Sequence, residues 1–225
     1  MVFEDKFTNK PEFQRVPKTA TVAAFDFDGT ISRGDSFWRF LFFSAPKLKV
    51  LKVGFSHFFP AFMSIFLPGK YADNAKESLV SDLFHGKTVE EAAQLGEDFA
   101  KYLVKSRLKP QTLSRLRWHQ LRGHEIVVVS ASPAIYLRPA CRYLGIENVL
   151  ATEFESDAGY LTGKFKGANC RGPEKARRVA KWLEGKPESF VWAYGNSAND
   201  NQLLAFADIG IRVDRQDISI APKEI

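Results

Sequence analysis

The stretch AAFDFDGTIS, residues 23–32, decides the fold. Asp26 and Asp28 stand two positions apart at the end of an apolar run, residues 21–27, and Gly29 follows at once. Residues i and i+2 lie on the same face of a strand, and glycine lets the chain turn tightly after it. Two carboxylates so close together need a cation, and Mg²⁺ prefers such oxygen ligands. A solvated turn is the alternative for this spacing alone, but the apolar strand before it favours a functional site.

Four further apolar segments have the length and composition of buried strands: residues 125–132, 148–154, 189–194 and 208–213. Near-continuous apolar runs are typical of parallel strands that are covered on both faces. Helical patterns separate them, at residues 111–122, 133–144, 173–184 and 199–207. Strands that alternate with helices predict an α/β fold with a doubly wound, Rossmann-like parallel sheet. The carboxyl ends of such strands form the usual ligand site, and the two aspartates lie there.

The alternation is interrupted after the first strand. No strand pattern occurs between residues 35 and 110. Four helices are predicted there instead, at residues 37–43, 48–66, 71–83 and 89–104. This stretch is too long for a simple connection. We therefore expect a helical cap at residues 35–109, inserted into a catalytic core of residues 20–34 and 110–225, with residues 1–19 as a lead-in. A later excursion, residues 157–169, is predicted to be a short hairpin or a loop.

Composition excludes several classes of protein. The chain has 225 residues, a length typical of one domain with an insertion. Cys141 and Cys170 are too few for a disulfide scaffold or a four-ligand zinc site. The net charge is +6, from 32 basic and 26 acidic residues, but no zinc-finger, helix-turn-helix or RNA-binding motif accompanies it. We therefore expect no nucleic-acid partner. The charged N-terminus lacks the apolar segment of a signal peptide, which favours a cytoplasmic protein.

The longest uncharged run, residues 53–69, bears on membrane insertion. It contains Pro60 and Pro68 and is shorter than the run of about 20 apolar residues that a spanning helix needs. We therefore expect a buried or interfacial pair of helices here rather than a spanning helix.

Four short motifs resemble, in order, those of the haloacid dehalogenase-like phosphatases. The segment DFDGT, residues 26–30, resembles the first motif. Ser130 fits the second and is preferred to Ser132, because it directly follows the apolar run of its strand. Lys175 resembles the basic residue of the third motif, and YGNSANDNQLL, residues 194–204, resembles the fourth. The order of the four motifs is more specific than any one of them.

The resemblance implies an Mg²⁺-dependent phosphatase and a role for each motif residue. Asp26 is then the nucleophile that forms an aspartyl-phosphate, and Asp28 is the general acid and base. Lys175 adds positive charge and keeps Asp26 ionised. The groups expected to bind the phosphoryl group or the substrate are Ser130, Ala131 and Gly29.

The fourth motif departs from the family pattern. The family usually has Gly-Asp at its start, whereas Gly195 is followed here by Asn196. Asp200 matches the second acidic position, so the expected metal ligands are Asp26, Asp28, Asn196 and Asp200. Two interpretations stay open. Asn196 is a neutral ligand supported by Asp200, or metal binding is weakened, as in a catalytically weak pseudophosphatase.

The place of the helical insertion resembles the phosphoserine-phosphatase-like branch of the family. Asp35 lies where that branch often carries an acidic residue that faces a substrate ammonium group. The same side chain could instead cap the helix predicted at residues 37–43. Both interpretations of Asp35 stay open.

The composition of the insertion bears on the substrate. Residues 36–72 contain no acidic residue, nine of the 20 Phe lie in residues 37–66, and the basic residues are Arg39, Lys47, Lys49, Lys52 and Lys70. A basic, Phe-rich segment suits peripheral contact with an anionic membrane. These features and the segment CRGPEK, residues 170–175, resemble the phosphatidylglycerophosphate phosphatases of the family. The alternative is that the Phe side chains form the core of the cap, and a lipid phosphate and a small soluble phosphomonoester both stay open as substrates.

Overall fold

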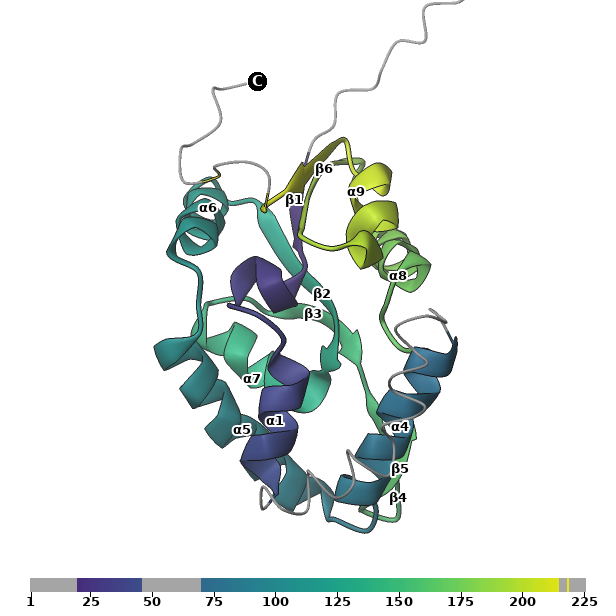
Figure 1. Cartoon of the computed structure of the whole chain (residues 1–225). Coiled ribbons are helices and arrows are strands. Elements are labelled where there is room, and N and C mark those ends of the chain that lie inside the picture. The colour runs from purple at the N-terminus through teal and green to yellow at the C-terminus, as the bar shows by residue number, and fades with distance from the viewer. Residues whose placement is uncertain (1–19, 46–69, 215–217, 219–225) are drawn as a thin grey trace, which may run out of the picture.

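Five parallel strands form the sheet at the centre of the computed structural model, which describes residues 20–45, 70–214 and 218 (Figure 1). They are β1 (Ala20–Phe25), β2 (Glu125–Pro133), β3 (Asn148–Thr152), β6 (Ser189–Gly195) and β7 (Ile209–Arg212). Their order is β3-β2-β1-β6-β7, so the direction of winding reverses between β1 and β6. The predicted doubly wound α/β fold is confirmed. Ligands bind at such a reversal, beyond the carboxyl ends of the strands.

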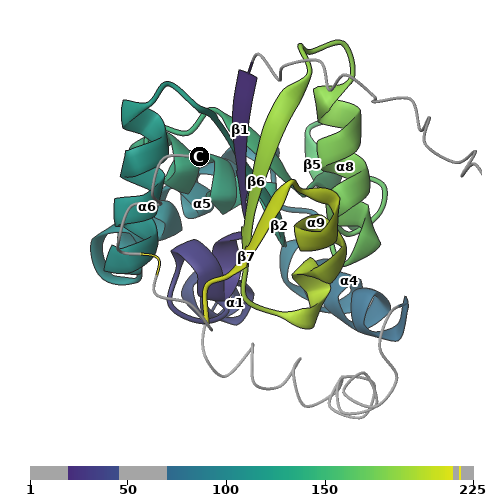
Figure 2. The ribbon, with the colours of Figure 1, turned by 90° about the horizontal axis from the view of Figure 1, so that it is seen from above.

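Helices cover both faces of this sheet, as Figure 2 shows. They are α6 (Pro110–Leu121) and α7 (Ala134–Tyr143) on one face, and α8 (Pro173–Leu183) and α9 (Asn201–Phe206) on the other. Successive side chains of a strand point to opposite faces. In β1, Ala23 and Phe25 accordingly join the core that includes Leu137 of α7, whereas Val22 and Ala24 join the core beneath α8 and α9. The helix predicted at residues 199–207 begins as a 3₁₀ turn, Ala198–Asp200, before α9.

Three helices of residues 35–109 lie beyond the carboxyl ends of the strands. They are α1 (Ser36–Ser44), α4 (Lys70–Phe84) and α5 (Val89–Ser106). The fully buried rings of Phe40, Phe84 and Phe99 pack together, with Tyr136 of α7 4.7 Å from the ring of Phe40. Part of the Phe surplus therefore forms an internal core shared with α7. The helix predicted at residues 48–66 lies outside the described residues.

An antiparallel hairpin, β4 (Phe154–Asp157) and β5 (Tyr160–Phe165), extends from the sheet towards α4. The strand predicted at residues 148–154 is β3, which ends at Thr152, so the prediction that it continues to residue 154 was wrong. The ring of Phe154 packs against Phe84 of α4 at 5.6 Å and against Phe165 at 6.2 Å. This contact with the inserted helices draws Phe154 into the hairpin.

No helix in the described ranges is long and apolar enough to cross a membrane. The uncharged run at residues 53–69 lies outside those ranges.

The close contact between α5 and α7 generates a first test. A Cβ on Gly96 of α5 would lie 2.2 Å from the backbone oxygen of Ile135 in α7. We expect Gly96→Ala to lower the free energy of unfolding by about 1–3 kcal/mol through overpacking, although alanine favours helix. Chemical denaturation followed by circular dichroism measures this. Ala93→Gly, at an exposed position of α5, measures helix propensity alone. A Gly96→Ala protein as stable as the wild type would contradict the tight packing.

Candidate active site

The chain turns sharply where β1 ends. Asp26 follows the last residue of β1, and residues Phe27–Ile31 form a wide helical turn. Asp28 and Gly29 have non-helical angles inside this turn, and φ of Gly29 is 74°, in the left-handed region that favours glycine. A Cβ on Gly29 would lie 2.2 Å from Nδ2 of Asn196. Glycine therefore lets the turn pack directly against Asn196.

A buried ammonium group lies between two buried carboxylates. Lys175, in the first turn of α8, donates from Nζ to Oδ1 of Asp26 and to Oδ1 of Asp200, each at 2.6 Å. Lys175 is 3% exposed, Asp26 4% and Asp200 0%. Thr30 donates from Oγ1 to the other oxygen of Asp26, at 2.8 Å. With both carboxylates ionised this group carries one net negative charge, which suits a neighbouring cation.

Burial and these neighbours set the pKa values. Burial raises the pKa of Asp26 to about 6, against the opposing effect of the Lys175 ammonium. Burial opposes the charge on Lys175, but the two carboxylates outweigh it and hold the pKa of that amine above its usual value. Burial also opposes the ionisation of Asp200, but Lys175 and hydrogen bonds from Ser197 hold its pKa below the usual value. A divalent cation beside Asp26 would lower the pKa of that carboxyl.

Asp200 supports the loop after β6. Its Oδ2 accepts hydrogen bonds from the backbone N of Asn196 at 3.1 Å and from N and Oγ of Ser197, each at 2.9 Å. With Lys175 on Oδ1, both oxygens are engaged within the protein. Asp200 therefore holds the backbone at Asn196 and Ser197 in place, and direct ligation of a metal by Asp200 stays a prediction.

Asp28 is held by donors from two other elements. Its Oδ1 accepts from the backbone N of Ser36 at 2.9 Å, and Ser132 donates from Oγ to Oδ2. Burial, and then the Asp35 carboxylate, raise the pKa of Asp28. Ser130, the serine preferred from the sequence, accepts a hydrogen bond from the backbone N of Ser132 at 3.1 Å. Sequence reasoning set Ser132 aside, although two positions along a strand keep both serines on one face.

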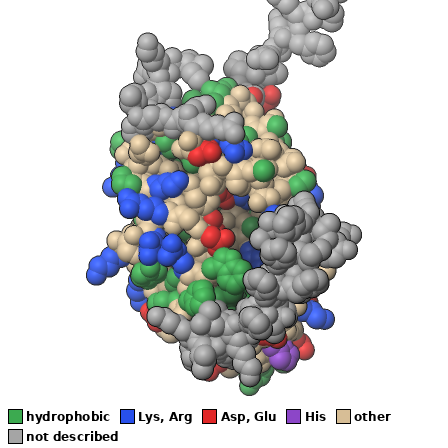
Figure 3. All heavy atoms as spheres, in the orientation of Figure 1, with side chains coloured by type: hydrophobic (Ala, Val, Ile, Leu, Met, Phe, Trp, Pro, Cys, Tyr) green, Lys and Arg blue, Asp and Glu red, His purple; other side chains and the backbone are tan. Residues whose placement is uncertain are grey.

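These groups surround one cavity of about 470 Å³ at the carboxyl ends of the strands. Figure 3 shows carboxylates in a hollow, with basic side chains to one side and apolar side chains below. The predicted site residues in its wall are Asp26, Asp28, Gly29, Asp35, Ser130, Ala131, Lys175 and Asn196. Of the predicted set, only Asp200 is not in the wall.

Two cations in the wall were missed from the sequence, Lys76 of α4 and Arg171 before α8. Burial lowers the pKa of Lys76 to about 8, against the opposing effects of Asp28, Asp35 and Asp73. Nη1 of Arg171 lies 4.0 Å from Oδ1 of Asp73. Lys76 belongs to no local motif, whereas Arg171 lies within the segment CRGPEK, residues 170–175, where only Lys175 was assigned a role. Docking of α4 on the core brings Lys76 to the cavity, next to Arg171 of the core.

Asp35 occupies the N-cap position of α1. Its Oδ1 accepts hydrogen bonds from the backbone N of Phe37 at 2.8 Å and of Trp38 at 3.2 Å. The capping interpretation is therefore observed. Because Asp35 also lines the cavity, its contact with a substrate ammonium group stays a prediction.

The oxygen donors in the cavity fit Mg²⁺. No three carboxylate, imidazole or thiolate groups converge within the part of the chain that the structure describes. A mixed set is available instead, from Asp26, Asp28 and the amide of Asn196. The Thr30 hydroxyl lies 2.8 Å from Oδ2 of Asp26 and 3.3 Å from Oδ1 of Asn196, so these two oxygens lie close to each other. Hard oxygen donors beside a net negative charge are what Mg²⁺ prefers.

Comparison with known proteins identifies similar chains. Residues 23–205 match the sequence model of the haloacid dehalogenase-like hydrolases. Protein CicA of Caulobacter vibrioides is 31% identical over 189 residues, which cover 83% of each chain. Histidinol-phosphatase of Neisseria meningitidis serogroup C is 26% identical over 131 residues, 56% of this chain and 59% of that protein. A substrate-bound phosphoserine phosphatase structure superposes with a TM-score of 0.59 at 18% identity, over 84% of each chain.

The buried ion pairs generate a second test. We expect Lys175→Met to lower the free energy of unfolding by about 3–5 kcal/mol, because two buried carboxylates then lose their cation. Adding Asp200→Asn should restore part of this loss. Arg177→Met, which removes an exposed cation that pairs with Glu174 on the same helix, is the matched control and should lower stability by less than about 1 kcal/mol. Denaturant unfolding measures all four proteins. If Lys175→Met were no less stable than the control, the ion pairs would not hold the site together.

Proposed function

This chain belongs to the haloacid dehalogenase-like hydrolases and is a phosphatase of that family, and we propose that it is an Mg²⁺-dependent phosphomonoesterase that works through an aspartyl-phosphate on Asp26. One observation carries the proposal. The cavity contains two carboxylates in different surroundings. Asp26 accepts a hydrogen bond from the buried Lys175, whereas Asp28 accepts hydrogen bonds from Ser36 and Ser132. Two carboxylates in different environments suit two different roles.

In the first step, an oxygen of Asp26 attacks phosphorus and the bond between phosphorus and the ester oxygen breaks. Lys175 and Thr30 fix the carboxylate through its two oxygens. The ammonium also offsets the negative charge of the approaching phosphate. The product is a mixed anhydride on Asp26, which splits one difficult displacement into two easier ones.

Asp28 is proposed to move the proton in both steps. Its raised pKa favours a protonated carboxyl that can give its proton to the leaving alkoxide. The resulting carboxylate then takes a proton from the water that attacks phosphorus, which releases phosphate and restores Asp26. Ser132 and the backbone of Ser36 hold the carboxyl in place for both transfers.

The phosphoryl oxygens need donors and positive charge around them. We propose that Ser130 and the backbone at Ala131 and Gly29 supply neutral donors, since all three line the cavity. When bound, Mg²⁺ supplies two positive charges that offset the charge on phosphate. Asp26, Asp28 and Asn196 would hold it, with Asp200 fixing the Asn196 loop. A weak or absent metal site, as in a pseudophosphatase, is the alternative.

The rest of the cavity favours a short polar group next to the phosphate. Lys76 and Arg171 bring positive charge to its wall, and Asp35 and Asp73 bring negative charge. A small phosphomonoester with further charged groups fits this mixed lining, as an amino-acid or amino-alcohol phosphate would. We propose that residues 35–109 select the substrate, because α1 and α4 supply most of these groups.

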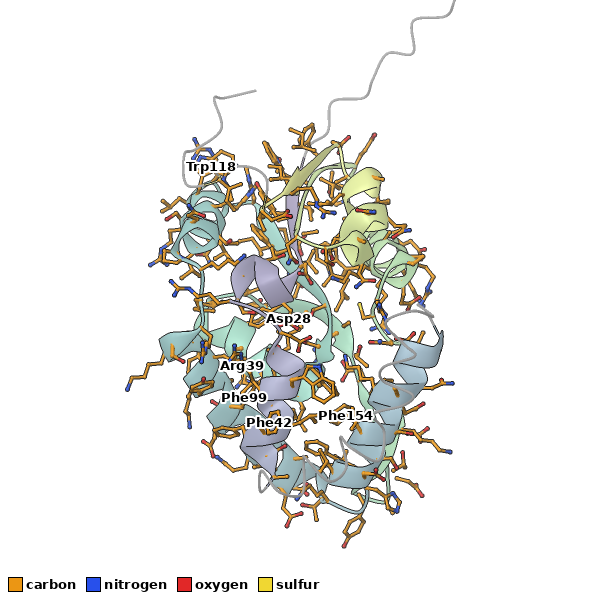
Figure 4. All side chains as sticks on the ribbon, in the orientation of Figure 1. Asp28, Arg39, Phe42, Phe99, Trp118 and Phe154 are labelled. Carbon is orange, nitrogen blue, oxygen red and sulfur yellow. The ribbon has the colours of Figure 1, made fainter. Side chains whose placement is uncertain are left out.

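A lipid phosphate is the second candidate, favoured by the face of α1 beside the cavity. Trp38 is 41% exposed and Phe42 is 42% exposed. Figure 4 shows Arg39 and Phe42 on α1. Arg39, on the same helix, forms no ion pair with another described residue. Exposed aromatic rings on a helix that also carries a cation suit an anionic membrane surface. The lysines that the sequence analysis implicated, Lys47, Lys49 and Lys52, lie outside the described residues.

Hydrolysis of an aryl phosphate tests the reaction. Asp26→Asn should lower the rate by more than about 10³-fold, because the amide cannot attack phosphorus. Asp157→Asn, an exposed change in β4, should leave the rate unchanged, and chelation of Mg²⁺ should abolish it. An inactive wild type at every Mg²⁺ concentration would favour the pseudophosphatase. An active Asp26→Asn protein would contradict the assigned nucleophile.

Vesicle binding separates the two substrate classes. If the lipid candidate is correct, the Asp26→Asn protein binds phosphatidylglycerol vesicles, and adding Trp38→Ser and Phe42→Ser weakens that binding about tenfold. Leu121→Ser, which removes an exposed apolar side chain on α6, is the control. Sedimentation with vesicles measures the bound fraction. Equal binding by the aromatic variant and the control would exclude this face as the membrane contact.

A further inference from the structure

We infer that Lys109 is a positioning residue for the reaction, which fixes the turn Phe27–Ile31 that carries Asp28. Lys109 lies where the chain returns from the inserted helices to α6. Its ammonium donates to the backbone oxygen of Gly29, inside the turn. The inference rests on the proposed role of Asp28.

The turn is attached to the returning chain at several points. The backbone N of Lys109 donates to the oxygen of Ile31 at 2.9 Å. The hydroxyl of Thr112, in the first turn of α6, donates to the oxygen of Thr30 at 2.7 Å. Three successive carbonyls of the turn, those of Gly29, Thr30 and Ile31, are therefore held from one side by the start of α6.

The lysine side chain supplies a donor that the turn itself does not provide. The non-helical angles of Asp28 and Gly29 interrupt the usual ladder of backbone hydrogen bonds. The amide of Arg33, which could otherwise reach back into the turn, instead donates to the oxygen of Arg107 at 2.6 Å. A charged donor makes a stronger hydrogen bond to a carbonyl than a neutral one.

Lys109 is free for this role, because it forms no ion pair with another described residue. Fixing the Gly29 carbonyl also fixes the peptide plane between Gly29 and Thr30, since a trans peptide is planar. Gly29 touches Asn196, and Thr30 donates to Asp26. The ammonium therefore holds a peptide unit that contacts both sides of the proposed site, without lining the cavity itself.

Steady-state hydrolysis of an aryl phosphate by the full chain, with Mg²⁺, tests this inference. Lys109→Met should lower kcat about tenfold and change KM less than about twofold, since misplacing a catalytic group slows the reaction without removing a substrate contact. Lys109→Arg should recover most of the rate, because a guanidinium can donate to the same carbonyl. Lys105→Met, which removes an exposed cation four positions earlier, is the matched control and should behave as wild type.

Each other outcome overturns the inference. Unchanged kcat in Lys109→Met would show that the turn needs no charged donor. An increase in KM with unchanged kcat would make Lys109 a substrate-binding residue. Equal losses in the Met and Arg variants would also contradict it, because a charged donor to the Gly29 carbonyl would then not restore the rate. An inactive wild type would overturn the proposed function instead, and so the two failures are distinguishable.

Discussion

The buried ammonium of Lys175 is the constraint on which the rest of the site depends. It joins Asp26, at the end of β1, to Asp200, after β6, although 174 positions separate the two carboxylates in the chain. Without it, two like charges would be buried close together, at an expected cost of about 3–5 kcal/mol out of an ordinary stability of about 5–15 kcal/mol. The parallel register of β1 and β6, which pairs Phe25 with Tyr194, brings both strand ends to the same level. The register of β1 and β6 therefore places the two carboxylates side by side, and the lysine at the start of α8 neutralises one of their two charges.

The inserted helices complete the site as well as cover it. On α4, Lys76 donates to the carbonyl of Ala131, and Glu77 accepts from the backbone N of Phe165 at 2.7 Å. On α5, Gly96 allows backbone-close packing against α7. The wall of the cavity thus comes from both parts of the chain. The cavity is therefore lined by charged groups of both signs. The exposed face of α1 beside it carries aromatic rings.

The sequence predicts those parts of the molecule that depend on local signals. Asp26 and Asp28 end an apolar strand, and Lys175 follows a proline at a helix start, so each could be placed before any contact was known. The hairpin start at Phe154 could not, because its side chain is directed by packing against α4. Lys76 has no motif and reaches the cavity only through tertiary docking. The inward orientation of Asp200 likewise depends on Lys175, which lies on another element.

If Asp26 is the nucleophile, it becomes covalently phosphorylated during turnover. The most direct test is acid quenching of the working enzyme with a fast-reacting aryl phosphate, followed by peptide mass spectrometry. We expect Asp26 to carry one phosphoryl group at early times and to lose it as the substrate is consumed. A phosphoryl group on any other residue, or none during demonstrable turnover, would contradict it.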